Sequence, residues 1–294
     1  MNGVLNVNKP SSFTSHDVVA VVRRLITEKQ IGHLGTLDPL ATGVLPLVVG
    51  TATRLVEYAS FDKEYAATCL LGRTTDSYDV TGKVLEEKIT AGLSKEQVER
   101  EVFNLLKITE QVPPMVSAVK QGGHKLYELA RKGQMVERQP RPIRLDAVEI
   151  LKIELPRVTF RVVCSAGTYV RGLCQTLGEV LGVGGCMESL ERTRVGPFLL
   201  QDAISLDEIK KRMEKGELSG MLLSAGLLVQ RLPEVKLEDA LLGDLCQGKV
   251  TGVSSGPPGV VRVMNLRGSL CAIGVIGEDG KSLKPKKVFG LEGI

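Results

Sequence analysis

The sequence contains no tryptophan, only three histidines and six cysteines among 294 residues, and these shortages narrow the classes of protein that it can represent. No two cysteines form a C-x-x-C pair, and the histidines are too scattered for a metal cluster, so we expect neither disulfides nor a metal site. No run of about 18 apolar residues occurs, and the first residues lack a cationic stretch followed by an apolar one. We therefore expect a cytoplasmic protein.

Two familiar phosphate-binding patterns are also missing. The segment "GVIGEDGKS" ends in Gly-Lys-Ser, but Gly274 and Gly280 are six positions apart where a P-loop requires five, and Glu278 to Gly280 is better explained as a hairpin turn. In "GEVLGVGGC", Met187 stands where the dinucleotide-binding pattern requires its third glycine. The sequence gives no indication of a bound nucleotide, and we expect no cofactor.

The order of apolar patterns indicates an α+β protein. A short strand is expected at residues 4–7, and Thr14 followed three positions later by Asp17 resembles the capping box that begins a helix. The run "GVLPLVVG" is typical of a buried strand, and further strands and helices alternate along the chain. Short apolar runs punctuated by glycine near the end predict a small β-rich module, so we divide the chain into domains at 1–228 and 229–294.

The segment "GHLGTLDPLATGVLPL", residues 32–47, places Asp38 in a loop between a helix and a buried strand. An Asp-Pro pair usually does no more than begin a turn. Here, however, three glycines let backbone and ligand approach closely, and rigid elements hold the loop on both sides. This setting favours a functional carboxylate.

Between residues 111 and 143 the chain leaves the regular pattern, mixing proline, glycine and basic residues around the amphipathic piece "KLYELARKG". Residues 119–144 carry seven Lys or Arg against two Glu. Such an excursion can be a solvated charged face, but its charge also suits an anionic partner. The basic residues that we expect to bind this partner are Lys120, Lys125, Arg131, Lys132, Arg138 and Arg141.

The glycine-rich Asp38 segment resembles the signature of the TruB family of tRNA pseudouridine synthases. The resemblance extends through "NGVLNVNKP", "KEYAATCLLG", "PPMVSAVKQGGHKLYELARKG", "GTYVRGLCQTLG" and "SLERTRVGPF". It implies a pseudouridine synthase fold, with a central mixed, mainly antiparallel sheet flanked by helices and loops and a small PUA-like C-terminal domain. It also implies an isomerase that converts uridine to pseudouridine at position 55 in the T-loop of tRNA.

The same resemblance implies the site residues. Asp38 matches the catalytic aspartate of the family, and Tyr65 in "KEYAATCLLG" matches its active-site tyrosine. A dry pocket would favour the neutral form of Asp38, so a cation is needed beside it, and we expect Arg171 to supply that charge. Leu190 is expected to form an apolar wall of the pocket.

Two further residues are expected to assist the extruded base and the loop. The target uridine must leave its stack, and we expect His33 to fill the space that it vacates. Lys9 is expected either to support the loop or to contact RNA. The anionic partner of the basic residues between 111 and 143 is then expected to be the RNA backbone, whose phosphates they contact.

The blocks around "PPMVSAVK" and "LYELAR" look more like the stand-alone bacterial synthases than like the guide-RNA-dependent ones. We therefore expect the protein to bind the T-stem-loop of tRNA without a guide RNA or an obligatory protein partner. We also expect it to be a monomer. A rival hypothesis is a non-catalytic tRNA-binding or RNA-folding protein that uses the same basic groove. A weaker rival is a nucleotide-dependent enzyme built on "GEDGKS", against which the glycine spacing argues.

Overall fold

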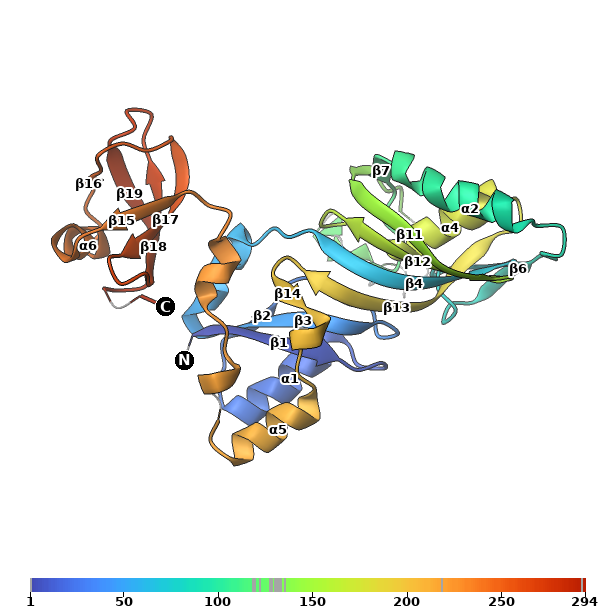
Figure 1. Cartoon of the computed structure of the whole chain (residues 1–294), viewed down its shortest axis with the longest axis horizontal. Coiled ribbons are helices and arrows are strands. Elements are labelled where there is room, and N and C mark those ends of the chain that lie inside the picture. Colours follow the sequence, from blue (N-terminus) through green and yellow to red (C-terminus); the bar gives the residue numbers. More distant parts are fainter. Residues whose placement is uncertain are drawn as a thin grey trace.

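The computed structural model describes residues 2–117, 120–121, 123–126, 129, 134, 136–217, 219–291 and 293–294. Figure 1 shows a large body built on a curved sheet, with helices on it, and a smaller β body that carries the C-terminus. No helix among the described residues is both long and apolar enough to cross a bilayer.

The large body is organised around one eight-stranded sheet. Its six main strands, in spatial order, are β1 (Gly3–Lys9), β3 (Thr42–Val49), β13 (Gly185–Val195), β4 (Lys63–Leu71), β12 (Arg157–Cys164) and β11 (Leu145–Glu154). Two short strands complete it, β2 (Ile31–His33) beside β3 and β14 (Phe198–Leu199) beside β13. Every pair is antiparallel except β3 and β13, so the expected mixed, mainly antiparallel sheet is present.

The parallel contact between β3 and β13 joins the two halves of the sheet. Its register is short, with Glu191 opposite Thr42 and Arg192 opposite Gly43. Gly43 has a φ of +98°, and a Cβ on it would collide with the backbone carbonyl of Arg192. Only glycine combines this conformation with so close an approach.

Helix α1 (Ser15–Ile26) begins as the sequence predicts. The Thr14 side chain accepts from the backbone N–H of Asp17, and the Asp17 carboxylate accepts from the backbone N–H of Thr14, which completes the capping box. Val18 and Val22 lie on its buried face. The helix packs against α5 (Leu206–Glu214), and the two lie on the same side of the β1–β3 half (Figure 1).

The other half of the sheet carries α4 (Val170–Val180), which packs on β13, and α2 (Lys95–Asn104), which contacts β11 and α4. The chain also forms the 3₁₀ turns η1 (Gly50–Tyr58), η2 (Leu105–Lys107), η3 (Leu200–Asp202), η4 (Ser219–Met221) and η5 (Ala225–Val229). Among the described residues, three further two-stranded pairs occur: β5 (Arg73–Thr75) with β6 (Val84–Glu87), β7 (Glu110–Gln111) with β10 (Arg141–Pro142), and β8 (Lys120–Gln121) with β9 (His124–Lys125).

The C-terminal body is a five-stranded sheet with one helix. Its strands, in spatial order, are β15 (Glu234–Leu237), β17 (Gly259–Asn265), β18 (Leu270–Ile276), β19 (Ser282–Val288) and β16 (Thr251–Gly252), and α6 (Asp239–Cys246) packs on β19 and β16. Asp279 accepts hydrogen bonds from the backbone N–H groups of Lys281 and Ser282, so "GEDGKS" forms a hairpin turn, as expected. The β-rich character of this region is therefore confirmed, while the division at residue 229 stays a prediction.

Candidate active site

The loop that follows β2 carries Asp38, and it is tied to helix α1. The backbone N–H of Leu37 donates to the Ser15 hydroxyl over 2.9 Å, and this hydroxyl lies 3.2 Å from the Leu37 carbonyl, to which it donates. The Ser15 side chain is buried. Two further backbone hydrogen bonds, from Ser12 to the Pro39 carbonyl and from Ala41 to the Asp38 carbonyl, fix the turn on the far side of the aspartate.

Lys9 stabilises the loop that carries Asp38 by hydrogen bonds to backbone carbonyls. Its side chain is fully buried, and its ammonium group donates to the carbonyls of Phe13 over 2.6 Å, Pro10 over 2.9 Å and Pro39 over 3.3 Å. Burial lowers the pKa of Lys9 to about 8, so the ammonium is still mostly charged at neutral pH. Of the two predicted roles for Lys9, this position favours support of the loop over contact with RNA.

Arg171 forms a two-point ion pair with Asp38. Its Nε lies 2.9 Å from Oδ2 of Asp38, and its Nη2 lies 3.2 Å from Oδ1. The second position of helix α4 holds this arginine, whose side chain is only 3% exposed, whereas 33% of the Asp38 side chain is open to the pocket. Only the contact from Nη2 to Oδ1 has hydrogen-bond geometry, while Nε lies against Oδ2 as a charge contact. The guanidinium therefore meets both oxygens and fixes the orientation of the carboxylate as well as its charge.

The rest of the Arg171 guanidinium is held by backbone and by a second acid. Nη1 donates to the Ser77 carbonyl and Nη2 to the Val116 carbonyl, each over 2.9 Å. The Asp79 carboxylate lies 3.6 Å from Nη1 and is itself buried. The sequence around Asp79, "TTDSYDVTG", also fits an ordinary polar turn and does not mark this residue as part of a site.

The protonation of Asp38 reflects a competition between burial and charge. Burial raises the pKa of Asp38, the positive charge of Arg171 lowers it, and the negative charge of Asp79 raises it again. The net direction is upward. The desolvation expected from the sequence therefore outweighs the cation that opposes it, and the pocket holds a carboxylate more basic than an ordinary aspartate.

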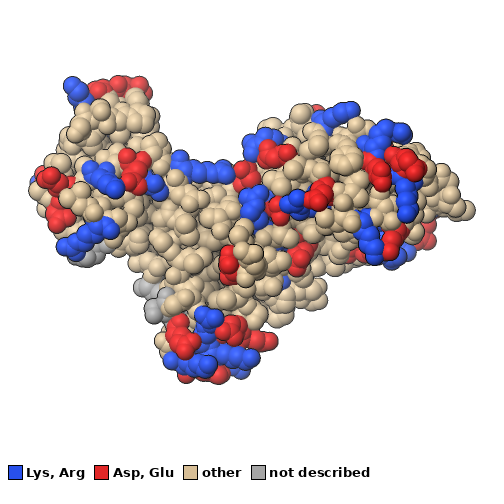
Figure 2. Space-filling model, in the orientation of Figure 1, with Lys and Arg blue, Asp and Glu red and all other residues tan. Residues whose placement is uncertain are grey.

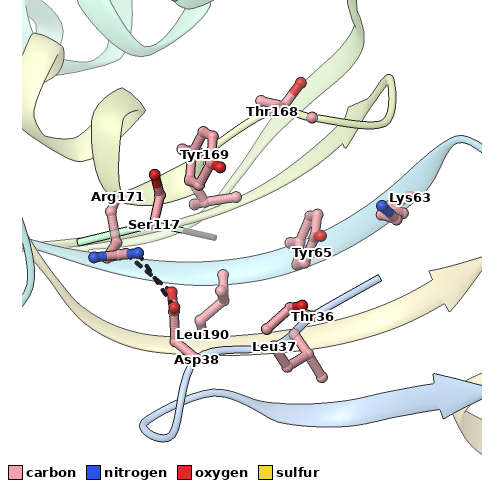
Figure 3. Close-up of a pocket in the computed structure, with 12 residues that line it drawn as sticks. Thr36, Leu37, Asp38, Lys63, Tyr65, Ser117, Thr168, Tyr169, Arg171 and Leu190 are labelled. Carbon is pink, nitrogen blue, oxygen red and sulfur yellow. Dashed lines mark hydrogen bonds and ion pairs between the residues drawn. The ribbon is translucent and has the colours of Figure 1, made fainter. Parts of the chain in front are cut away.

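Asp38 and Arg171 open into a cavity of about 220 Å³. Figure 3 shows Tyr65 on β4 and Leu190 on β13 on the walls of this pocket. The other lining residues are Thr36, Leu37, Lys63, Ser117, Gly167, Thr168, Tyr169 and Val170. Burial raises the pKa of Tyr65, so its hydroxyl is protonated at neutral pH. The structure thus brings together Asp38, Tyr65, Arg171 and Leu190 from four separate segments.

His33 lies outside this pocket, in a neighbouring cavity of about 90 Å³. Its ring packs edge-on against His16, with 5.6 Å between the ring centroids. Burial lowers the pKa of His33 to about 4, and the nearby positive charges act in the same direction, so the imidazole is neutral at pH 7. The predicted role of His33 in filling the vacated stack stays a prediction.

The predicted phosphate contacts are described only in part. Arg138 donates from Nη1 to the Pro113 carbonyl over 2.9 Å, and Arg141 lies exposed on β10 opposite Gln111. Arg131 and Lys132 lie outside the described residues, as do the side chains of Lys120 and Lys125. Among the described residues, no group of three or more His, Cys, Asp or Glu side chains is placed to hold a metal ion.

Comparison with known proteins decides the family. The pattern of the TruB family pseudouridylate synthase N-terminal domain matches residues 23–170, and that of the tRNA pseudouridylate synthase B C-terminal domain matches residues 171–230. The chain belongs to the TruB family. This TruB-family chain is 43% identical over 98% of its length to a protein of Heliobacterium mobile named tRNA pseudouridine synthase B, 95% of which is covered. It is 40% identical over 98% of its length to the protein of that name from Microcystis aeruginosa, 99% of which is covered.

Solved structures agree with the family. One chain in the crystal structure of a Cbf5-Nop10-Gar1 complex superposes on this TruB-family chain with a TM-score of 0.75 at 28% identity, covering 99% of this chain and 85% of that one. A chain of an H/ACA RNP bound to a substrate RNA containing 2′-deoxyuridine gives a TM-score of 0.74 at 26% identity, covering 99% and 86%. The fold is the pseudouridine synthase fold with a PUA-like C-terminal sheet, as expected from the sequence.

Proposed function

We propose that this protein is an isomerase that converts uridine to pseudouridine at position 55 in the T-loop of tRNA. The observation that carries the proposal is the Asp38–Arg171 ion pair at the edge of a cavity of about 220 Å³, in a chain of the TruB family. The proposal agrees with the name tRNA pseudouridine synthase B, which its relatives bear.

The reaction needs only groups that the pocket contains. The bond between ribose C1′ and N1 of uracil breaks, the base turns, and C1′ joins C5, while N1 gains a proton and C5 loses one. Nothing is oxidised and no group is imported, so a nucleophile, a base and a closed pocket suffice. Asp38 starts the reaction as a carboxylate, by attack on the sugar, by attack on the base or by removal of a sugar proton. Arg171 keeps the carboxylate oriented and favours its charged form.

Tyr65 and Leu190 act on the base. The Tyr65 ring provides a face on which uracil stacks, and we assign its hydroxyl to the place where the C5 proton must be removed after the base has rejoined the sugar. Because burial keeps that hydroxyl protonated, it can take up the C5 proton only if its own proton leaves. Leu190 lines the same pocket and adds an apolar wall.

Delivery of the base requires that the RNA be opened. Extrusion of a nucleotide costs a few kcal/mol, which stacking and backbone contacts offset. We assign to His33 the role of filling the space that the extruded base leaves in the RNA stack. We assign the contacts with RNA phosphates to the basic stretch that includes Arg138 and Arg141. The protein acts on the T-stem-loop as a cytoplasmic monomer, without a guide RNA or a partner protein.

The test uses tRNA that carries tritium at uridine C5, together with nucleoside analysis of the product. We expect Asp38→Asn to release tritium more than about a thousandfold more slowly than the parent, equivalent to roughly 4 kcal/mol of barrier. Asp239→Asn, on an exposed turn of α6, is the matched control and retains the parental rate. Release by Asp38→Asn at the parental rate would refute the assignment of Asp38. A parent protein that binds tRNA yet leaves its nucleosides unchanged would instead favour the non-catalytic rival.

A further inference from the structure

Lys63 lies beside the pocket, and the reaction just described gives it no role. It is the first residue of β4, two positions before Tyr65, so the two side chains project from the same face of the strand about 7 Å apart. Lys63 lines both the catalytic cavity and the neighbouring cavity that contains His33. Figure 3 shows it at the end of the pocket away from Asp38 and Arg171.

A second cation, the guanidinium of Arg192, lies close to Lys63. Arg192 is directly opposite Tyr65 in the β4–β13 register and is fully buried. Its Nε donates to the Val44 carbonyl over 2.7 Å and its Nη2 to the Gly35 carbonyl over 3.1 Å. Its guanidinium also acts on the Tyr65 hydroxyl, where it opposes the rise of the pKa that burial causes.

Gly35 shows how close the two cations are. The point where a Cβ of Gly35 would stand is 3.0 Å from Nζ of Lys63 and 3.6 Å from Nη1 of Arg192. Their separation therefore cannot exceed the sum of these two distances. Neither side chain forms an ion pair with an acid among the described residues.

Two neighbouring cations without an anion are costly at a partly buried position. Burial lowers the pKa of Lys63 to about 8, and the positive charge of Arg192 acts in the same direction. Proteins rarely bury a charged group without a partner, because no favourable interaction then offsets the hydration free energy that the group loses. An anion bound at Lys63 would supply the missing charge.

We propose that Lys63 binds a phosphate of the RNA backbone next to the nucleotide whose base enters the pocket, with Arg192 adding fixed positive charge behind it. The inference rests on the proposed function for the identity of the ligand. A nucleotide carries a phosphate on each side of its ribose, so a base stacked on Tyr65 brings phosphates close to the cavity that Lys63 also lines. An ammonium group binds phosphate as a point charge and needs no planar geometry.

The test combines a protein variant with a change in single phosphates. A T-arm RNA is prepared with one neutral methylphosphonate linkage, placed in turn at each position flanking the target uridine. We expect one of these linkages to weaken binding to the parent protein about tenfold, and Lys63→Gln to weaken binding of the unmodified RNA by a similar factor. In Lys63→Gln the sensitive linkage should cause no further loss. Lys63→Gln should also lower the slope of log affinity against log salt by about 0.7 to 0.9, the value for one phosphate contact.

Two controls make the result specific. Lys63→Arg keeps the charge and should keep the salt slope, while Lys210→Gln, exposed on α5, should change neither affinity nor slope. Thermal unfolding shows whether Lys63→Gln is folded. If it is not, the parent protein carries the test, because parental binding that none of the neutral linkages weakens would overturn the phosphate site. Losses that add together in Lys63→Gln, or an unchanged salt slope, would overturn the phosphate site. Failure of the parent to form pseudouridine in the unmodified RNA would overturn the proposed function instead, and the two outcomes are read in separate assays.

Discussion

Ser15 and Leu37 are joined by two hydrogen bonds, which connect the first residue of helix α1 to the residue that precedes Asp38. The hydroxyl accepts from one backbone group and donates to the other, so a single side chain satisfies both. The helix that the Thr14 capping box begins therefore also positions the aspartate.

Ser15→Ala removes this connection. Both backbone groups of Leu37 then lose a buried partner, and we expect the free energy of unfolding to fall by about 1 to 3 kcal/mol. The loop that carries Asp38 is also less well positioned, so kcat should fall by roughly ten- to a hundredfold. Denaturant unfolding and single-turnover tritium release measure the two effects. Ser11→Ala, which removes an exposed hydroxyl 3.5 Å from the Leu40 carbonyl, is the control and should change neither. An unchanged kcat in Ser15→Ala would show that Asp38 is positioned by other contacts.

Arg171→Lys keeps the charge beside Asp38 but loses the two-point contact. The single nitrogen of a lysine cannot lie against both carboxylate oxygens, and it leaves the Ser77 and Val116 carbonyls without their donors. We expect kcat to fall by at least about a hundredfold, measured as single-turnover pseudouridine formation at saturating tRNA. Arg212→Lys, which changes a surface ion pair with Glu208 on α5, should retain the parental rate. Retention of most activity by Arg171→Lys would mean that charge alone suffices.

The raised pKa of Asp38 predicts the acid side of the pH profile. Because the carboxylate is the active form, kcat should fall as the pH drops through the pKa of Asp38, and this fall should begin above the ordinary value of 3.8. Arg171 and Lys9 lower this pKa and Asp79 raises it, so Asp79→Asn should move the acid limb to lower pH. The measurement is log kcat against pH at saturating tRNA, over the range in which circular dichroism shows the fold intact. An acid limb that moves upward in Asp79→Asn would contradict the charge balance described here.

Arg141 is predicted to contact a phosphate. Arg141→Ala should weaken tRNA binding and lower the salt slope by about one unit, because one cation is lost from the interface. Arg157→Ala is the matched control, since this exposed arginine on β12 is already held by Glu188. Binding titrations at several salt concentrations give the slopes. Equal slopes for Arg141→Ala and the parent would remove Arg141 from the phosphate contacts.

The local features of the fold could be predicted from the sequence because neighbouring residues determine them. The capping box of Thr14 and Asp17, the buried strand in "GVLPLVVG" and the Asp279 turn each depend on a few adjacent positions. The family motifs likewise named Asp38, Tyr65, Arg171 and Leu190, which the structure brings to one cavity.

What escaped prediction depends on contacts between distant segments. Asp79 faces Arg171 only because a polar turn after β5 lies against the start of α4, and nothing within "TTDSYDVTG" specifies that contact. The burial of Lys9 and the closeness of Lys63 to Arg192 likewise follow from the packing and register of the sheet strands. A basic residue in a strand is most often exposed, so sequence pattern alone gave no reason to place these charges inside.

The close main-chain approach at Gly43 has a consequence for how the enzyme can vary. Asp38 precedes β3, one of the two strands in that contact. The other strand, β13, carries Leu190 and pairs with β4, which carries Tyr65. The backbone contact between Gly43 and Arg192 therefore sets the distance between the walls of the pocket that uracil enters, and substitutions at other positions leave these backbone atoms in place. Lining residues can change to suit a different RNA while the separation of the opposing walls is preserved, whereas any side chain at Gly43 would force those walls apart.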